Sequence, residues 1–450
     1  MRIFFLLFLI SSGISLSQNV QHFIDQVDTN RITTRLQEFA GEVSTTVNGN
    51  AQIIINRESN QNDIAKDYLV ERLNALPHLN VTTINYSTRG TNIIATQTGL
   101  TNPNDIYIIC AHYDTVTNYC VDDNATGTIA VLEIAELLSQ QCTDNTIVYA
   151  FWDEEEQGLI GARNYAQAAR ARNDNIKAVL NLDMIGYDGD GDNDFDIDVR
   201  DVANSLAMKD DIVQMLNQYG TNWNLNANVI NPGTPLSDHK VFWDENYTAL
   251  LIGEAWSMND QNNQYHTTRD RFNNLDLSYC TDIIKLCTAY MATKAGLNYI
   301  DSSIQNTGSS LTVTNDPTAT YRWIDCSTNL SISGATSHSY TPTTDGIYKV
   351  SITKSGCTEE SDCINFTTLS HNSLKTPIQV SYNQATKDLL VTNTTKAEIQ
   401  LRLYHVNGQF AQEWITEKAQ DNINLKNYSA GIYILQYFVE GQRHILKIQI

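Results

Sequence analysis

The chain has 450 residues, 42% of them hydrophobic, with 29 Lys and Arg against 51 Asp and Glu. This length exceeds what one ordinary hydrophobic core supports, so about two to four domains are expected. The formal net charge of -22 at pH 7 repels phosphate backbones and anionic lipid headgroups. Composition therefore argues against nucleic acid and acidic membranes as partners.

The N-terminus has the composition of a secretory signal peptide. Arg2 is followed by an apolar run over residues 3–10 and then by small residues. The run is well short of the roughly 20 residues that a membrane span requires, and no later stretch is long and apolar enough. We therefore expect a signal peptide over residues 1–17 and a secreted or cell-surface protein. A buried first helix fits less well, because the run lacks flanking polar periodicity.

Strand and helix patterns alternate between residues 60 and 300. The strand-like segments are 92–98, 105–114, 145–153, 176–187 and 248–256, and the helical segments include 128–140 and 161–173. This alternation predicts an α/β fold with a mostly parallel, doubly wound sheet covered by helices on both faces. Sites in such folds gather outside the carboxyl ends of the strands.

The composition changes to Ser, Thr and Asn near residue 300, and helical periodicity stops. Short strand-like segments separated by turn residues then continue to the end of the chain. They predict two small all-β sandwich domains. The predicted boundaries are 18–300 for the α/β domain, 305–368 for the first β module and 374–450 for the second.

The chain contains eight cysteines. Disulfides can form in an exported protein, although sequence spacing does not give their pairing. Cys110 lies inside the apolar run IYIIC and is predicted to be a buried thiol. None of the cysteines has the close paired spacing of a thiolate zinc site.

Metal-ligand side chains follow several successive elements at the expected site edge. His112 and Asp114 follow one strand, VDDNATG precedes the next helix, the acids 153–156 follow a second strand, and Asp183 follows a third. Any one of these alone is more often a core or solvated residue, but their coincidence at one edge indicates a cation. Histidine and carboxylate ligands suit zinc, and several carboxylates indicate two metals that share a water. His266 offers a further ligand downstream.

The motifs AHYD, VDDNATG, DEEEQGLIGA, NLDMIGY, SDHKVF and YHTTRD, in that order, resemble those of the secreted co-catalytic dizinc aminopeptidases, the bacterial leucyl aminopeptidase and aminopeptidase Y-like peptidases. The resemblance covers residues 60–295. It implies two Zn²⁺ ions held by His112, Asp123, Glu156, Asp183 and His266, with Asp123 shared and followed by a cis peptide. Which of Glu156 and Asp183 accompanies which histidine is left open by the spacing.

The same resemblance implies roles for residues beside the metals. Glu155 resembles the general base, and Asp114 the carboxylate that orients His112. Tyr265 occupies the place of an oxyanion donor, although a packing aromatic is equally compatible. Asp238 is expected to line the pocket or support the site without binding metal. Asp153 is expected to support the site from behind or to be solvated.

The predicted function is a secreted zinc aminopeptidase that removes N-terminal residues from peptides through a two-metal-activated water. A glutaminyl cyclase-like acyltransferase on the same fold is one alternative, but the EExGLxG series at 155–161 favours the peptidase. A carboxypeptidase or dipeptidase with the same metal core is another, since fold does not fix the substrate. A binding protein on an inactive scaffold is less compatible with a complete ligand set.

The stretch DGDGDNDFDID, Asp188–Asp198, is denser in Asp than the family pattern requires. We expect a flexible acidic loop near the cleft mouth that favours cationic substrates. Ca²⁺ binding is the alternative, but the Gly and Glu of an EF-hand loop are absent from their positions.

The two β modules carry resemblances of their own. Residues 311–368 resemble Ig-like or PKD-like modules through YRWIDC and GIYKVSI. Residues 374–450 resemble the C-terminal sorting domain of type IX secretion substrates in Bacteroidetes through YHVNGQ and LKNYSAGIYILQY. This implies that the secretion machinery recognises the C-terminal domain, whereas a plain accessory sandwich without an export role is the alternative.

Overall fold

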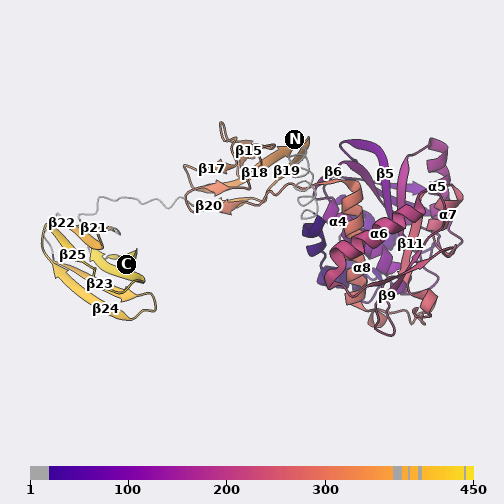
Figure 1. The fold of residues 1–450 in the computed structure, drawn as a ribbon, viewed down its shortest axis with the longest axis horizontal. Coiled ribbons are helices and arrows are strands. Elements are labelled where there is room, and N and C mark those ends of the chain that lie inside the picture. Colours follow the sequence, from indigo (N-terminus) through magenta and orange to yellow (C-terminus); the bar gives the residue numbers. More distant parts are fainter. Residues whose placement is uncertain (1–19, 368–377, 384–385, 394–397, 440–441) are drawn as a thin grey trace, which may run out of the picture. The chain divides into compact units, whose positions relative to one another are not determined.

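The computed structural model describes residues 20–367, 378–383, 386–393, 398–439 and 442–450. The expected signal peptide, residues 1–17, lies outside them. The chain divides into two compact units, which are Met1–Thr341 with Gly346–Asn365 and Pro342–Asp345 with Phe366–Ile450 (Figure 1). Across the described residues, no helix combines the length and apolar character that a membrane crossing requires.

The first unit is built on an eight-stranded sheet with the order β10-β9-β11-β8-β5-β7-β4-β3. The four central strands run parallel. They are β7 (Asn145–Trp152), β5 (Asn102–His112), β8 (Ile176–Leu182) and β11 (Ala249–Glu254). Three of them are almost entirely buried and β5 is buried over its C-terminal half, because helices cover the sheet on both sides. The predicted α/β sheet with a parallel centre is therefore confirmed.

Antiparallel pairing appears on both sides of this parallel centre. Strand β4 runs antiparallel to β7, and β3 runs antiparallel to β4. Strand β9 runs antiparallel to β11, and β10 pairs with β9 in parallel. The bounds are Leu79–Asn85 for β3, Thr91–Gln97 for β4, Asp194–Asp198 for β9 and Asn226–Ile230 for β10. The sheet is therefore mixed, with its parallel strands gathered where the site forms.

Helices cover both faces of the sheet, as predicted for a doubly wound fold (Figure 1). One face carries α2 (Thr29–Phe39), α3 (Asp63–Asn74), α4 (Gly127–Leu138), α6 (Ser205–Tyr219) and α8 (Leu277–Ala295). The other carries α5 (Ile160–Arg172) and α7 (His239–Asp244). Helix α4 is almost completely buried, and its fully buried Glu133 forms ion pairs with Arg31 and Arg35 of α2. This pairing compensates for the cost of burying the carboxylate.

The first β module belongs to the same compact unit and consists of two small sheets. One has the order β13-β14-β17, and the other has the order β16-β15-β18-β19, with β20 paired to β18. Trp323 is fully buried between them and donates a hydrogen bond to the Ser337 carbonyl at 2.9 Å. The strands are β13 (Gln305–Asn306), β14 (Leu311–Thr312), β15 (Thr320–Asp325), β16 (Leu330–Ser331), β17 (Ser339–Tyr340), β18 (Gly346–Lys354), β19 (Cys357–Glu360) and β20 (Ile364–Phe366).

The second unit also has two antiparallel sheets, with the orders β21-β22-β25 and β24-β23-β26-β27. Alternate residues of these strands form one buried apolar cluster, which includes Leu389, Leu401 and Leu435. The strands are β21 (Ile378–Asn383), β22 (Asp388–Asn393), β23 (Ile399–His405), β24 (Phe410–Thr416), β25 (Gln420–Asn424), β26 (Ile432–Val439) and β27 (Gln442–Gln449). The predicted all-β character of both modules is thus present.

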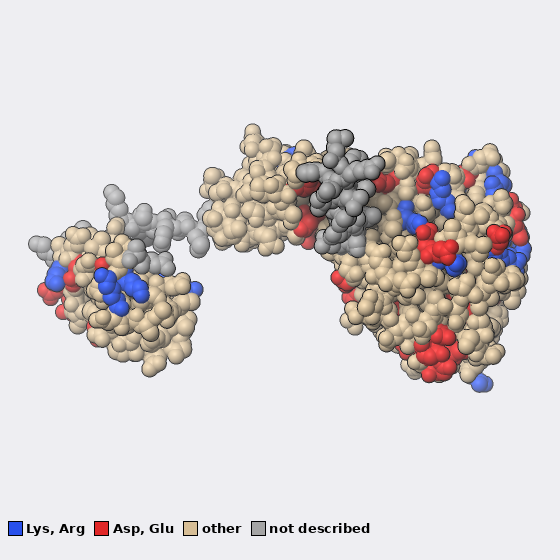
Figure 2. Space-filling view, in the orientation of Figure 1, with Lys and Arg blue, Asp and Glu red and all other residues tan. Residues whose placement is uncertain are grey.

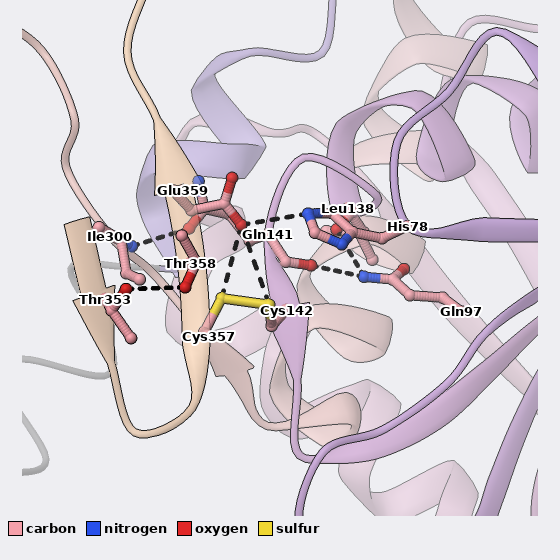
Figure 3. Close-up of a disulfide and its surroundings, with 10 residues drawn as sticks. All are labelled: His78, Gln97, Leu138, Gln141, Cys142, Ile300, Thr353, Cys357, Thr358 and Glu359. Carbon is pink, nitrogen blue, oxygen red and sulfur yellow. Dashed lines mark hydrogen bonds and ion pairs between the residues drawn. A yellow bond between two sulfur atoms is a disulfide. The ribbon is translucent and has the colours of Figure 1, made fainter. Parts of the chain in front are cut away.

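Two disulfides form, and both involve the first β module. Cys326–Cys363 closes a separation of 37 residues within the module, whereas Cys142–Cys357 joins β19 to β6 (Cys142–Thr143) across 215 residues. Beside the second bridge, Glu359 lies 3.3 Å from Nε2 of His78 (Figure 3). Cys110 is free and buried, as predicted. The module is therefore covalently fixed to the α/β domain.

We expect the Cys142–Cys357 bridge to stabilise the first unit more than the Cys326–Cys363 bridge does. The cross-link over 215 residues restricts the unfolded chain more than the one over 37 residues. The loop-entropy difference is about 1.5 kcal/mol. Urea unfolding of the double variant C142S/C357S should therefore show a larger loss of unfolding free energy than C326S/C363S. Equal losses, or the reverse order, would contradict this ranking.

Candidate metal centre

Six of the predicted site residues converge at the carboxyl ends of the central strands, and they come from five different segments of the chain. His112 is the last residue of β5, and Asp183 directly follows β8. Asp123 lies in the helical turn η1 (Val121–Thr126) that leads into α4, and a cis peptide joins it to Asn124, as the resemblance implies. The others are Glu155 and Glu156 after β7 and His266 in the loop after β11.

Asp123 stands between the two histidines. Its Oδ1 lies 3.3 Å from Nε2 of His112, and its Oδ2 lies 3.2 Å from Nε2 of His266. One carboxylate therefore faces an imidazole with each of its oxygens. This is the arrangement expected of a ligand that two cations share.

The remaining carboxylates divide between the two histidines. Oδ1 of Asp183 lies 3.4 Å from Nε2 of His112, whereas Oε2 of Glu156 lies 3.2 Å from Nε2 of His266. These distances associate Asp183 with His112 and Glu156 with His266. The cluster has two halves, one with His112 and Asp183 and the other with His266 and Glu156.

Several oxygens of this cluster are buried without a hydrogen-bond donor. Within the described chain, Oδ2 of Asp123, Oε1 of Glu156 and Oδ1 of Asp183 accept no hydrogen bond. A buried carboxylate oxygen without a donor is costly. Ligand atoms of His112, Asp123 and Glu156 also lie within 4.8 Å of one another. The donor set, which is imidazole and carboxylate without thiolate, therefore fits zinc.

Protonation of His266 and Glu156 partly compensates for the negative charge of the cluster. The neighbouring carboxylates of Asp123 and Glu156 raise the pKa of His266 to about 10. Burial, together with the charge of Asp123, raises the pKa of Glu156 to about 7. Protonated imidazole thus carries the positive charge next to these carboxylates. Because a metal ligand must be deprotonated, metal binding here has to release protons.

Asp114 holds His112, Glu155 and Glu156 in place. Its carboxylate accepts the backbone N–H groups of Glu155 at 3.1 Å and Glu156 at 3.2 Å. Oδ1 of Asp114 lies 3.5 Å from Nδ1 of His112, and the Asp114 carbonyl oxygen lies 3.2 Å from the same nitrogen. These contacts turn Nε2 of His112 toward Asp123, which is what the predicted orienting role requires.

Tyr265 and Asp238 lie where the sequence placed them, beside the cluster. The Tyr265 ring stacks on the His266 ring with centroids 3.7 Å apart. Asp238 is fully buried at the start of α7, and neither of its carboxylate oxygens accepts a hydrogen bond from the described residues. Burial raises the pKa of Asp238 well above its usual value. Neither side chain is among the residues that pair with the histidines.

Sequence reasoning missed a carboxylate behind the cluster and left another undecided. Asp270 accepts the backbone N–H groups of Asp122 and Asp123 at 3.0 and 3.1 Å, and it is fully buried. It is the final residue of YHTTRD, so the signal was inside a quoted motif. Asp153 is also fully buried, and it accepts hydrogen bonds from Asn62 at 2.7 Å and from the Thr91 N–H at 2.9 Å. Asp153 therefore anchors the loop from behind and is not solvated.

Arg57 was missed as well. Its guanidinium is fully buried and donates to the carbonyl oxygens of Tyr113, Tyr119 and Cys120 at 3.2, 2.8 and 2.7 Å. These carbonyls belong to the loop between His112 and Asp123. A single Arg between polar residues gives no sequence signal for such a role.

The acidic stretch 188–198 contains a correction. The flexible loop expected over its whole length is wrong for Asp194–Asp198, which form the buried strand β9. The period-two pattern Asp-Phe-Asp-Ile-Asp was the signal, because Phe195 and Ile197 enter the core. Asp188, Asp190, Asp192 and Asp260 gather at the surface with carboxylate atoms within 4.8 Å, and Figure 2 shows acidic side chains concentrated near β9. Ca²⁺ binding there remains a prediction.

A cavity of 480 Å³ opens beside the cluster. His112, Asp123, Glu155, Glu156, Asp183 and Tyr265 form one side of it. Strands β9, β10 and β11 and the segment after β10 form the rest. Among the described residues, no Lys or Arg lines it.

The comparisons agree with this geometry. Residues 92–291 match the model of Peptidase family M28, and this segment contains every residue of the cluster. An aminopeptidase of Pseudomonas aeruginosa is 38% identical over 123 residues, which are 25% of this chain and 23% of that protein. A probable zinc metalloprotease of Pyrenophora tritici-repentis is 35% identical over 105 residues, 21% of this chain and 24% of that protein. The chain thus spans about a quarter of the length of these relatives.

Among solved structures, the LapA aminopeptidase of Legionella pneumophila superposes with a TM-score of 0.54 at 18% identity, covering 62% of this chain and 75% of that one. This likeness shows a shared fold. Residues 92–291 are thus similar to Peptidase family M28 in sequence.

We expect Arg57→Met to destabilise the first unit by about 2–4 kcal/mol, because it leaves buried carbonyl oxygens without donors. Urea unfolding followed by fluorescence measures this loss. Arg89→Met is the matched control, since Arg89 is exposed and should change stability by less than about 0.5 kcal/mol. Similar unfolding midpoints for the two variants would contradict the structural role of Arg57.

Proposed function

We propose that the α/β domain is a zinc aminopeptidase that hydrolyses the first peptide bond of peptides with a free N-terminus. The observation that carries this proposal is the Asp123 carboxylate between two imidazoles, with the unpaired Glu155 beside it on the wall of a cavity. The match of residues 92–291 to peptidase family M28 supports it.

We infer that the cluster holds two Zn²⁺ ions. His112 and Asp183 would bind one ion, His266 and Glu156 the other, and Asp123 both. When bound, such ions polarise a substrate carbonyl and lower the pKa of water. The shared ligand and the oxygens without donors support two ions over one.

Glu155 is the proposed general base. It lines the cavity, and in the described structure it forms no ion pair with either histidine, so its carboxylate is free to accept a proton. Burial raises the pKa of Glu155 well above the usual value, partly offset by His112, which suits a group that both takes and returns a proton. It would accept the proton of the attacking water and transfer it to the leaving amine. Tyr265, on the same wall, is the candidate donor to the developing oxyanion.

The acidic lining supports action at a free N-terminus. An α-amino group is a cation, and the cavity offers it carboxylates without any competing Lys or Arg side chain. A blocked N-terminus has no such charge. The volume of 480 Å³ also suits one terminal residue better than an extended chain.

We further propose that the protein is exported, with residues 1–17 as signal peptide and residues 374–450 as the sorting domain that the type IX machinery recognises. The two disulfides support an oxidising compartment. The compact all-β unit formed mainly by Phe366–Ile450 supports a separate module.

Zinc content should follow the two halves of the cluster. We expect two zinc ions per chain in the wild type, one in His266→Gln and none in Asp123→Asn, because only Asp123 serves both halves. Elemental analysis after gel filtration gives these ratios. Asp190→Asn, which removes an exposed carboxylate outside the cavity, should keep both ions. A single ion in the wild type would overturn the two-metal assignment.

Peptide hydrolysis tests the activity itself. Glu155→Gln should lower kcat by about 10²–10⁴-fold with unchanged zinc content, because it removes only the proton acceptor. Glu154→Gln, its neighbour outside the cavity lining, should retain most of the activity. Each variant is assayed on free and N-acetylated peptides, with and without chelator, and on a peptide with N-terminal Gln. Cleavage of acetylated peptides, or cyclisation of the glutaminyl peptide without hydrolysis, would contradict aminopeptidase action.

A further inference from the structure

The cavity is lined by three carboxylates that the proposed reaction does not use, which are Glu254 of β11 and Asp196 and Asp198 of β9. Asp196 and Asp198 lie on one face of β9 and form the floor, while Phe195 and Ile197 on its other face point into the core. Both Asp side chains are more than nine-tenths buried, and both line the cavity.

Strand register places this floor next to the metal centre. Asp196 pairs with Gly253 of β11, and a Cβ at Gly253 would lie 2.8 Å from the carbonyl oxygen of Asp183. Asp196 is therefore two strand spacings, about 10 Å, from a proposed ligand. In the next row of the sheet, Asp198 lies between Ile230 of β10 and Leu251 of β11.

Asp198 has an acceptor oxygen that the described protein does not use. Its Oδ1 accepts the Thr234 N–H at 2.6 Å, and its Oδ2 accepts no hydrogen bond from the described residues. Arg200 is near, but its guanidinium donates to the Gly233 carbonyl at 2.9 and 3.0 Å. In the described part of the chain, no Lys or Arg forms an ion pair with Asp198.

Asp196 is held differently. Both of its oxygens accept hydrogen bonds from Ser257, one from the hydroxyl at 2.7 Å and one from the backbone N–H at 2.8 Å. It therefore contributes negative charge to the cavity from a fixed position. Asp198 is the group with a free acceptor.

The walls between the metal centre and these carboxylates are apolar. Ile230, Leu236, Leu251 and Trp256 line the same cavity. Apolar walls that end in an acidic floor complement a long aliphatic stem with a cationic tip. A purely structural role for Asp198 would need only the oxygen that accepts the Thr234 N–H, and it would not explain why the second oxygen is left without a partner in a residue that lines the cavity.

We propose that this cavity binds the side chain of the N-terminal residue and selects lysine or arginine, with the cationic tip paired to Oδ2 of Asp198 in the field of Asp196. The role of the pocket in the reaction rests on the proposed aminopeptidase function. The binding of a cationic side chain in the pocket does not rest on that function.

Binding of free amino acids tests the pocket without any hydrolysis. L-lysine and L-norleucine share the four-carbon stem and differ in the terminal ammonium. Titration calorimetry on the wild-type protein should show that lysine binds at least about tenfold more tightly, because the ion pair is largely desolvated. Equal affinity would overturn the proposal, whether or not the protein proves to be a peptidase.

Variants then test which carboxylate binds the cationic tip of the side chain. Asp198→Asn keeps an oxygen for the Thr234 N–H and should lower kcat/KM on lysyl-aminomethylcoumarin by about tenfold or more, mainly through KM, with little change on the leucyl substrate. Asp196→Asn should act in the same direction. Asp362→Asn, a charge-matched control on the surface of the first β module, should leave the lysine-to-leucine ratio unchanged. Equal loss on both substrates would mean that Asp198 binds the α-amine or only supports the fold, and either result would overturn the proposal.

Discussion

The fold buries several carboxylates around Asp123, and the stability of the site depends on how their mutual repulsion is compensated. An inner group faces the cavity, and an outer group of Asp114, Asp153 and Asp270 lies behind it. Asp114 and Asp270 accept backbone N–H groups of the segments that carry the inner carboxylates, and Asp153 accepts those of Thr91 and Glu154. These hydrogen bonds fix the loops that hold the ligand residues. Among the described residues, one oxygen each of Asp123, Glu156 and Asp183 in the inner group accepts no hydrogen bond, and cations can compensate for the burial of these oxygens.

This division explains why one site can be both rigid and short of positive charge. Burial raises the pKa of Asp153 and of Asp270 to about 7, so these two carboxylates are close to protonation. A ligand that binds only the folded state stabilises it by mass action. Metal binding to the inner carboxylates would therefore stabilise the folded state and also supply the Lewis acid for the proposed reaction. The buried positive charge of Arg57 is stabilised by hydrogen bonds to backbone carbonyl oxygens. Arg57 therefore does not pair with the carboxylates of the cluster, which stay available to bind cations.

The sequence was sufficient wherever a short-range pattern carried the information. Strands β5, β7 and β8 could be predicted because each is an apolar run in the sequence. His112 and Asp183 could be assigned to the edge of the sheet because each lies at the end of such a run. The pairing of Asp183 with His112 could not be read, because it depends on β8 lying beside β5 in the sheet. Asp270 and Arg57 act on backbone groups far away in sequence, and no local pattern marks such contacts. Strand β9 was misjudged because its acidic face looked like a solvated loop, although that face lines a cavity.

Strand β9 also shows how two cation sites of different chemistry can stand side by side. At the metal centre, two imidazoles and three carboxylates surround one region, which suits an ion that demands several ligands at short distance. On the cavity floor, both oxygens of Asp196 are occupied by Ser257, and Asp198 has one oxygen to offer. One free acceptor is too few for a divalent metal, but it is enough for an ammonium group whose stem is covered by apolar walls. The fold thus separates inorganic from organic cations by the number of free oxygens, although both sites draw on the same excess of acidic residues.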